Sequence, residues 1–207
     1  MDSQLGRSAI ITIVFIAVLC LIELLDRGLQ LELHSLGIYP RSPAGLVNIL
    51  VAPLIHGSWN HLLSNSATLL ILLTTLLYAY PRSSKQVLLL IYLGSGTGVW
   101  LFARESHHFG ASGLTHGLMF YIFTSGILRR DRQSIALAMV VFFLYGGMIW
   151  SIFPQEPGIS YESHFFGAAA GVLGAFAFSH LDPEPPKKKY NWEDEENTTD
   201  ENYKDQG

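Results

Sequence analysis

The sequence predicts an all-α membrane protein: a bundle of six transmembrane helices with a long membrane-associated first loop. The first observation is the scarcity of charge in most of the chain. Residues 1–181 hold only 8 acidic and 9 basic side chains, about 9% of that part, whereas about a quarter of the residues are charged in soluble domains. A soluble domain could not cover its surface with so few charges. No basic stripe is present either, so nucleic acid is not expected as a partner.

The second observation is a set of apolar runs of membrane-spanning length. Crossing about 30 Å of hydrocarbon takes roughly 20 helical residues. Six runs approach this length, at residues 8–25, 60–80, 86–102, 112–128, 134–153 and 163–181. The first run is expected to remain in the protein, because no cleavage site of small residues follows it. A seventh stretch, residues 44–55, is shorter and contains Pro53, so we interpret it as an interfacial or re-entrant part of the first loop.

The third observation is the distribution of basic residues around these runs. Nine Lys and Arg residues flank one set of alternate ends, and only Arg27, Arg41 and Arg104 flank the other set. The positive-inside rule therefore predicts a multi-pass protein with both termini in the cytoplasm. The compact six-span form favours a bacterial inner (plasma) membrane. Residues 182–207 hold 9 acidic and 4 basic residues and are predicted to form a disordered cytoplasmic tail after a domain at residues 1–181.

A few polar side chains remain inside the apolar runs, where each costs a few kcal/mol on insertion scales. They are His61 and Asn65 in the second run, Ser112 and His116 in the fourth, and His164 in the sixth. These three runs cross the membrane in the same direction, so their first turns lie at the same depth, just below the outer surface. We therefore expect the polar side chains to converge on one site.

The local sequence around Ser112 is typical of a reactive helix end. Ser112 lies in Gly110-Ala-Ser-Gly113, where a loop meets a helix whose first N–H groups are unpaired and favour negative charge. Small residues spaced three and four apart in the fourth and sixth runs predict close helix packing. Such packing would bring the Ser112 hydroxyl within hydrogen-bonding reach of His164, and a serine beside a histidine base is an activated nucleophile.

The second to sixth runs contain no Asp or Glu, so the pattern predicts a Ser-His dyad without a third acidic member. Each residue also has a structural interpretation: a serine bonded to its own backbone, a glycine stripe used only for packing, or a histidine that bridges helices. A zinc site is disfavoured because His-Glu-x-x-His is absent. A small transporter would be expected to contain an inverted repeat, and none is visible.

These motifs resemble the rhomboid family of intramembrane serine proteases. The resemblance rests on His56-Gly-Ser-Trp-Asn-His61-Leu-Leu-Ser-Asn65, Gly110-Ala-Ser112-Gly113 and His164-Phe-Phe-Gly167-Ala-Ala-Ala-Gly171. It implies that Ser112 is the nucleophile and that His164 is the base. It also implies an oxyanion site built from His61, Asn65 and the Ser112 N–H, with Gly110 shaping it.

The resemblance further implies cleavage of single-pass membrane proteins near the outer end of their transmembrane segment, within the lipid bilayer and without a cofactor. Substrate would enter past the fifth run. The alternative is a catalytically inactive rhomboid-like protein that binds membrane helices, although inactive relatives lose the serine or the histidine. Two features depart from the family: His116 occupies a position that is often aromatic, and a Trp-Arg pair of the first loop is missing.

Overall fold

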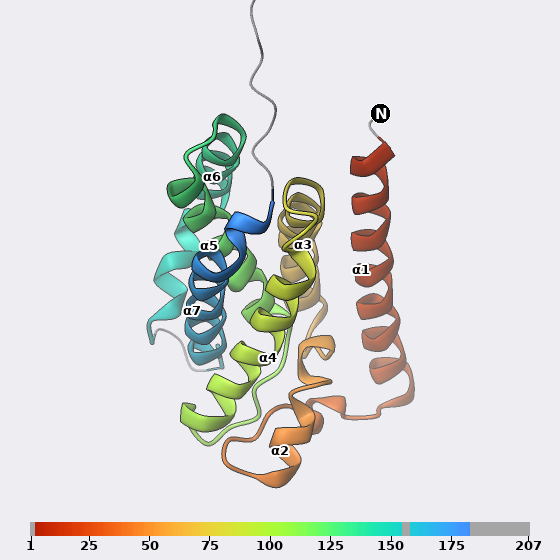
Figure 1. The fold of residues 1–207 in the computed structure, drawn as a ribbon. Coiled ribbons are helices and arrows are strands. Elements are labelled where there is room, and N and C mark those ends of the chain that lie inside the picture. The colour runs from red at the N-terminus through yellow and green to blue at the C-terminus, as the bar shows by residue number, and fades with distance from the viewer. Residues whose placement is uncertain (1–2, 155–157, 183–207) are drawn as a thin grey trace, which may run out of the picture.

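The computed structural model describes residues 3–154 and 158–182, and within them all extended secondary-structure elements are helices. The long helices are α1 Ser3–Leu29, α3 Trp59–Ala79, α4 Ser84–Phe102, α5 Ser112–Arg129, α6 Arg132–Tyr145 and α7 Tyr161–Phe178, with the short α2 Pro43–Asn48 in the first loop. Four short 3-10 helices are η1 Leu33–Leu36, η2 Ala52–Leu54, η3 Gly146–Ile152 and η4 Ser179–Leu181. Figure 1 shows the bundle, with α1 at its side against α3. The predicted all-α membrane bundle is confirmed.

Five of these helical segments are long and apolar enough to span a membrane: α1, α3, α4, α6 continued by η3, and α7 continued by η4. The sixth predicted span, α5, is less apolar and stays a prediction. Its composition has a structural reason, because α5 contacts α3, α4, α6 and α7, and 11 of its 18 residues are buried. A helix surrounded by protein can carry Ser, Thr, His and Gly, since few of its side chains meet lipid.

Two helix boundaries differ from those expected. The fifth run does not form one continuous α-helix, because the chain tightens into η3 at Gly146. The last helix begins at Tyr161, with Ser160 as its N-cap, so Glu162 lies in its first turn. The expectation that this helix carries no acid is therefore wrong, because the apolar run begins later than the helix.

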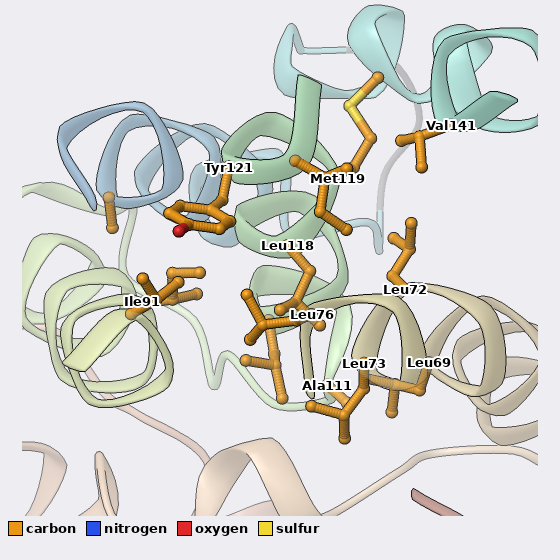
Figure 2. Close-up of a cluster of buried hydrophobic side chains, with 14 of the residues drawn as sticks. Leu69, Leu72, Leu73, Leu76, Ile91, Ala111, Leu118, Met119, Tyr121 and Val141 are labelled. Carbon is orange, nitrogen blue, oxygen red and sulfur yellow. The ribbon is translucent and has the colours of Figure 1, made fainter. Parts of the chain in front are cut away.

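Apolar side chains between α3, α4 and α5 fix the position of the central helix. Leu69, Leu72 and Leu76 of α3 and Leu118 of α5 belong to one cluster of buried residues, and Figure 2 shows Leu76 beside Leu118. Burying a leucine side chain contributes about 1.5–3 kcal/mol. This packing fixes α5 in the middle of the bundle and thereby fixes the position of its first turn.

Helices α5 and α7 approach each other so closely that their backbones touch, as the spacing of small residues predicts. A Cβ atom at Gly167 would collide with the backbone of Gly113, and one at Gly171 would collide with the backbone of Gly117. Glycine is required at these positions by the contact itself. The consequence is that the first turns of α5 and α7 lie against each other.

The first loop is attached to the loop between α4 and α5. Ile38 and His108 exchange two backbone hydrogen bonds, and the Arg41 guanidinium donates to the Ala103 carbonyl at 3.0 Å. The predicted interfacial stretch contains most of α2 and all of η2, and Val47 of α2 is 67% exposed. An exposed apolar side chain there is compatible with the membrane contact expected for this loop.

The start of α1 and the end of η4 lie at the same end of the bundle, while α3, α5 and α7 begin at the other end (Figure 1). Asp182, placed in the tail by the sequence, is held in the bundle: its carboxylate accepts hydrogen bonds from the Arg82 N–H at 2.7 Å and the Ser83 hydroxyl at 2.6 Å. The rest of the predicted tail, residues 183–207, lies outside the described residues.

Candidate active site

The first two turns of α3, α5 and α7 carry all five polar residues singled out from the sequence. His61 and Asn65 come from α3, Ser112 and His116 from α5, and His164 from α7. The imidazole rings of His116 and His164 stack with a centroid distance of 4.0 Å and an angle of 8°. The His61 ring reaches the chain just before Ser112, because a Cβ atom at Gly110 would lie 2.5 Å from its Cε1. The structure thus gathers groups from three helices at one end of the bundle.

Ser112 is the first residue of α5 and is partly exposed. Its carbonyl accepts hydrogen bonds from the Thr115 hydroxyl at 2.9 Å and from His116 Nδ1 at 2.7 Å. Within residues 3–154 and 158–182 neither its hydroxyl nor its N–H has a hydrogen-bond partner. The free N–H follows from the helix geometry, which leaves the first amides of a helix unpaired. Both groups are therefore available to an incoming molecule.

His164 is only 8% exposed, and one of its ring nitrogens has a defined role. Its Nδ1 lies 3.0 Å from the backbone carbonyl of Ser151. A carbonyl can only accept, so Nδ1 carries the proton and Nε2 presents a lone pair. The described residues provide no hydrogen-bond partner for Nε2, so the hydrogen bond between Ser112 and His164 expected from the sequence is not formed in this structure. Contacts between a nucleophile and its base are often long before substrate binds, and this tautomer is the one that a base requires.

His116 packs against the other face of this arrangement. Besides its stacking on His164, its Nδ1 donates to the Ser112 carbonyl, and its Nε2 lies 2.8 Å from the Ser151 hydroxyl. The ring therefore supports His164 by stacking, and it makes hydrogen bonds that an aromatic hydrocarbon ring could not make.

Asn65 provides an unpaired donor one helical turn after His61 on α3. The residue is 6% exposed, and its Nδ2 is enclosed without a hydrogen-bond partner in the part of the chain that the structure describes. A buried amide without a partner costs about 1–3 kcal/mol, so such a group needs a functional explanation. Its two N–H bonds suit an oxygen that gains negative charge.

Gly110 allows the His61 ring to approach the loop before α5. A Cβ atom at Gly110 would lie 2.5 Å from His61 Cε1 and 2.8 Å from Nε2. The backbone φ of Gly110 is 108°, a value that residues with side chains rarely adopt. Position 110 thus requires glycine for two independent reasons, and both affect where the His61 ring lies.

His56 contributes to the site, although the sequence analysis singled out only the later residues of its motif. Its ring meets the edge of the His61 ring at a centroid distance of 5.0 Å, and its Nε2 accepts a hydrogen bond from the Ala111 N–H at 3.4 Å. Burial, followed by the nearby His61, lowers the pKa of His56 to about 4. His56 is therefore a neutral acceptor that ties the loop before α3 to the residue preceding Ser112.

The start of α7 is held by a second histidine from the loop between α4 and α5. His108 Nδ1 lies 2.6 Å from the hydroxyl of Ser160, the N-cap of α7, and its Nε2 lies 3.0 Å from the Arg104 carbonyl. Burial lowers the pKa of His108.

Glu162, in the first turn of α7, faces Arg104, with 3.7 Å between carboxylate and guanidinium, so it is not the partner of His164 Nδ1. Across the described parts of the chain, no group of three His, Cys, Asp or Glu residues suits a metal ion.

An all-α bundle with five apolar spans, carrying a serine and two stacked histidines at the ends of buried helices, defines an integral multi-pass membrane protein with a polar site inside the bundle. The model of the rhomboid domain matches residues 43–181, and the chain belongs to the rhomboid family.

Similar proteins come from mycobacteria. The uncharacterized protein Rv1337 of Mycobacterium tuberculosis is 33% identical over 183 residues, which cover 84% of this chain and 75% of the relative. The uncharacterized protein Mb1372 of Mycobacterium bovis gives the same values. The uncharacterized protein ML1171 of Mycobacterium leprae is 30% identical over 185 residues, which cover 85% of this chain and 72% of the relative.

Proposed function

We propose that this protein is an intramembrane serine endopeptidase that cleaves single-pass membrane proteins near the outer end of their transmembrane segment. The observation that carries the proposal is the state of His164. Its Nδ1 proton is bound by a carbonyl, its Nε2 lone pair has no partner among the described residues, and its ring stacks on His116 of α5. Together with the unpaired hydroxyl of Ser112, this provides the general base and the nucleophile that a Ser-His dyad requires.

In the first step Ser112 Oγ attacks the carbonyl carbon of the scissile peptide bond while His164 Nε2 takes the hydroxyl proton. The resulting tetrahedral intermediate collapses, the C–N bond breaks, and His164 gives its proton to the departing amine. Water then attacks the acyl-enzyme by the same route and releases a carboxylate product with Ser112 restored. Throughout, the Ser151 carbonyl stabilises the imidazolium that forms transiently at His164.

The oxyanion of each tetrahedral intermediate would be held by the Asn65 amide, the His61 ring and the Ser112 N–H. The unpaired Nδ2 of Asn65 supports this assignment, because the group is buried and has no hydrogen-bond partner among residues 3–154 and 158–182. A single preorganised donor of this kind contributes about 2.7–4 kcal/mol to transition-state stabilisation in soluble enzymes.

Substrate would approach from the side of α6 and η3. This segment is the least buried of the apolar spans, and its Phe143 and Trp150 are 88% and 69% exposed. In a bilayer these side chains meet lipid or another transmembrane helix. A substrate segment with helix-weakening residues is expected to be cleaved faster, because a helical peptide bond is shielded by its own hydrogen bonds. Both termini would be cytoplasmic, in a bacterial plasma membrane.

The test is cleavage of a model single-span substrate by the full chain in detergent. The parent is compared with Ser112→Ala and His164→Ala, and with the matched variants Ser64→Ala and His34→Ala, whose parent residues lie on the exposed surface. We expect the first two variants to lose cleavage and the second two to retain it. Full activity in Ser112→Ala would reject the proposal. A parent that binds single-span helices but never cleaves them would favour the inactive binding protein.

A further inference from the structure

Ser151, in the 3-10 helix η3, contacts both stacked histidines. Its backbone carbonyl lies 3.0 Å from His164 Nδ1, and its hydroxyl lies 2.8 Å from His116 Nε2. The chain reaches this position 13 residues before His164, from a different element of the bundle. Ser151 thus binds one ring nitrogen of each histidine, and the two rings stack on each other with a centroid distance of 4.0 Å.

The direction of each hydrogen bond follows from the chemistry of the partners. His116 Nδ1 faces the Ser112 carbonyl, which can only accept, so in the neutral ring the proton is on Nδ1 and Nε2 accepts. The Ser151 hydroxyl is then the donor to Nε2. The carbonyl of Met148, 2.8 Å from the same hydroxyl, competes for this proton. The orientation of His116 therefore depends on a hydroxyl shared between two acceptors.

We propose that the Ser151 hydroxyl is a positioning group for the base: it fixes the plane of His116, and His116 fixes the plane of His164 by stacking. Ser151 bonds to both histidines and to the Met148 carbonyl, and not to Ser112, so we assign its effect on cleavage to the two rings. The proposal rests on the proposed function, because it requires His164 to be the base. It adds a residue outside the three motifs by which the site is recognised.

Burial explains why one hydroxyl matters. His116 is 3% exposed and His164 is 8% exposed, so water has little access to replace a lost hydrogen bond. Without the hydroxyl, neither His116 Nε2 nor the Met148 carbonyl would have this donor. Both groups are acceptors, so we expect the His116 ring to turn away from the carbonyl. A turn of His116 opens the parallel stack, and the Nε2 lone pair of His164 then points less well toward Ser112.

The first test measures kinetics of Ser151→Ala and Ser151→Thr. The alanine variant keeps the backbone carbonyl at His164 and removes only the hydroxyl, and the threonine variant restores it. We expect about a tenfold lower kcat in Ser151→Ala and KM within about twofold of the parent. Tm should fall by a few degrees, because a buried acceptor loses its partner, and Ser151→Thr should recover most of both kcat and Tm. Thr68→Ala is the matched control, because the Thr68 hydroxyl donates only to the Ser64 carbonyl on its own helix, and its kcat should equal that of the parent.

The second test uses ring 15N chemical shifts in histidine-labelled parent and Ser151→Ala protein, and it needs no proteolysis. We expect both His116 and His164 to carry the proton on Nδ1, and the Ser151→Ala change to move the Nε2 signal of His116. An unmoved His116 signal would overturn the proposal, as would a kcat of Ser151→Ala equal to that of Thr68→Ala. A parent that cleaves nothing but shows the expected shifts would reject the proposed function and leave the hydrogen bond established. A fall in Tm that accompanies the kcat loss and persists in Ser151→Thr would assign Ser151 a structural role instead.

Discussion

Replacing Asn65 by leucine should change stability and activity in opposite directions. Asn65 is 6% exposed, and its Nδ2 is enclosed without a partner. Leaving a buried amide unpaired costs about 1–3 kcal/mol, and a similar-sized apolar group avoids that cost. Asn65→Leu should therefore raise the free energy of unfolding by about 1–2 kcal/mol. The same change removes an oxyanion donor, so kcat should fall by about 100- to 1000-fold, equivalent to about 2.7–4 kcal/mol.

Ser66 offers a matched control on the same helix. Its hydroxyl is also buried and unpaired, so Ser66→Ala should remove an unpaired polar atom without touching the proposed oxyanion site. We expect Ser66→Ala to be at least as stable as the parent and to keep its kcat. Stability is measured by thermal unfolding in detergent, and activity by cleavage of a single-span substrate.

The two assays together can refute the reasoning in either half. An Asn65→Leu protein that keeps its kcat would show that the amide does not bind the oxyanion. A variant that loses stability and activity in parallel would show that Asn65 is a structural residue whose amide has a partner in solution. Only an inactive protein that is equally stable or more stable agrees with the geometry.

Three further predictions concern helix packing, the hydrogen bonds of Asp182 and the effect of pH on stability. Gly167→Ala should lower the free energy of unfolding by about 1–3 kcal/mol, because the added methyl group overpacks against α5. Gly28→Ala is the control, because its Cβ would meet nothing within 4 Å, and it should not lower the stability. Chemical unfolding in detergent compares the two variants, and equal stabilities would contradict the close contact. Asp182→Asn should lower the free energy of unfolding by about 1.5–3 kcal/mol, because the charge-assisted hydrogen bond from the Ser83 hydroxyl is lost. Cleavage per folded molecule should stay unchanged, and loss of cleavage in folded protein would contradict this prediction. Burial lowers the pKa of His56 to about 4, so the unfolded chain binds more protons between about pH 6.5 and 4, and stability should fall as pH falls through that range; His56→Gln should flatten this part of the pH dependence of Tm, and an unaltered slope would contradict the assignment.

The sequence predicted the membrane bundle and the convergence of polar residues because both follow from one-dimensional patterns. Run length predicts spans, and the alternation of direction places the starts of α3, α5 and α7 at one depth. The spacing of small residues predicted the α5–α7 contact, which Gly167 and Gly171 make through their backbones. These inferences need only helix geometry and the cost of burying polar groups.

The contacts of Ser151 and His56 could not be predicted in this way. Ser151 lies in an apolar run that reads as one continuous helix, and its hydroxyl meets His116 only because the chain tightens into η3. His56 lies in a loop whose course depends on tertiary contacts. The sequence analysis placed the start of the last helix at residue 163, where the apolar run begins. The helix begins two residues earlier, at Tyr161, because Ser160 is its N-cap.

The distribution of unsatisfied polar atoms gives an independent reason to locate function at this end of the bundle. In the described parts of the chain, seven buried side-chain atoms lack a hydrogen-bond partner, and five of them belong to residues near the starts of α3 and α7 or the end of α1: Glu23, His56, Asn65, Ser66 and Glu162. Each costs stability, and a fold selected for stability alone would have apolar side chains there. The leucine-rich packing between α3 and α5 supplies the stability that lets such groups persist. Of these atoms, Asn65 Nδ2 is the one that belongs to the proposed oxyanion site. A bundle used only for binding membrane helices would gain from an apolar side chain at that position, whereas a hydrolytic site needs a donor that stays unpaired until the transition state forms.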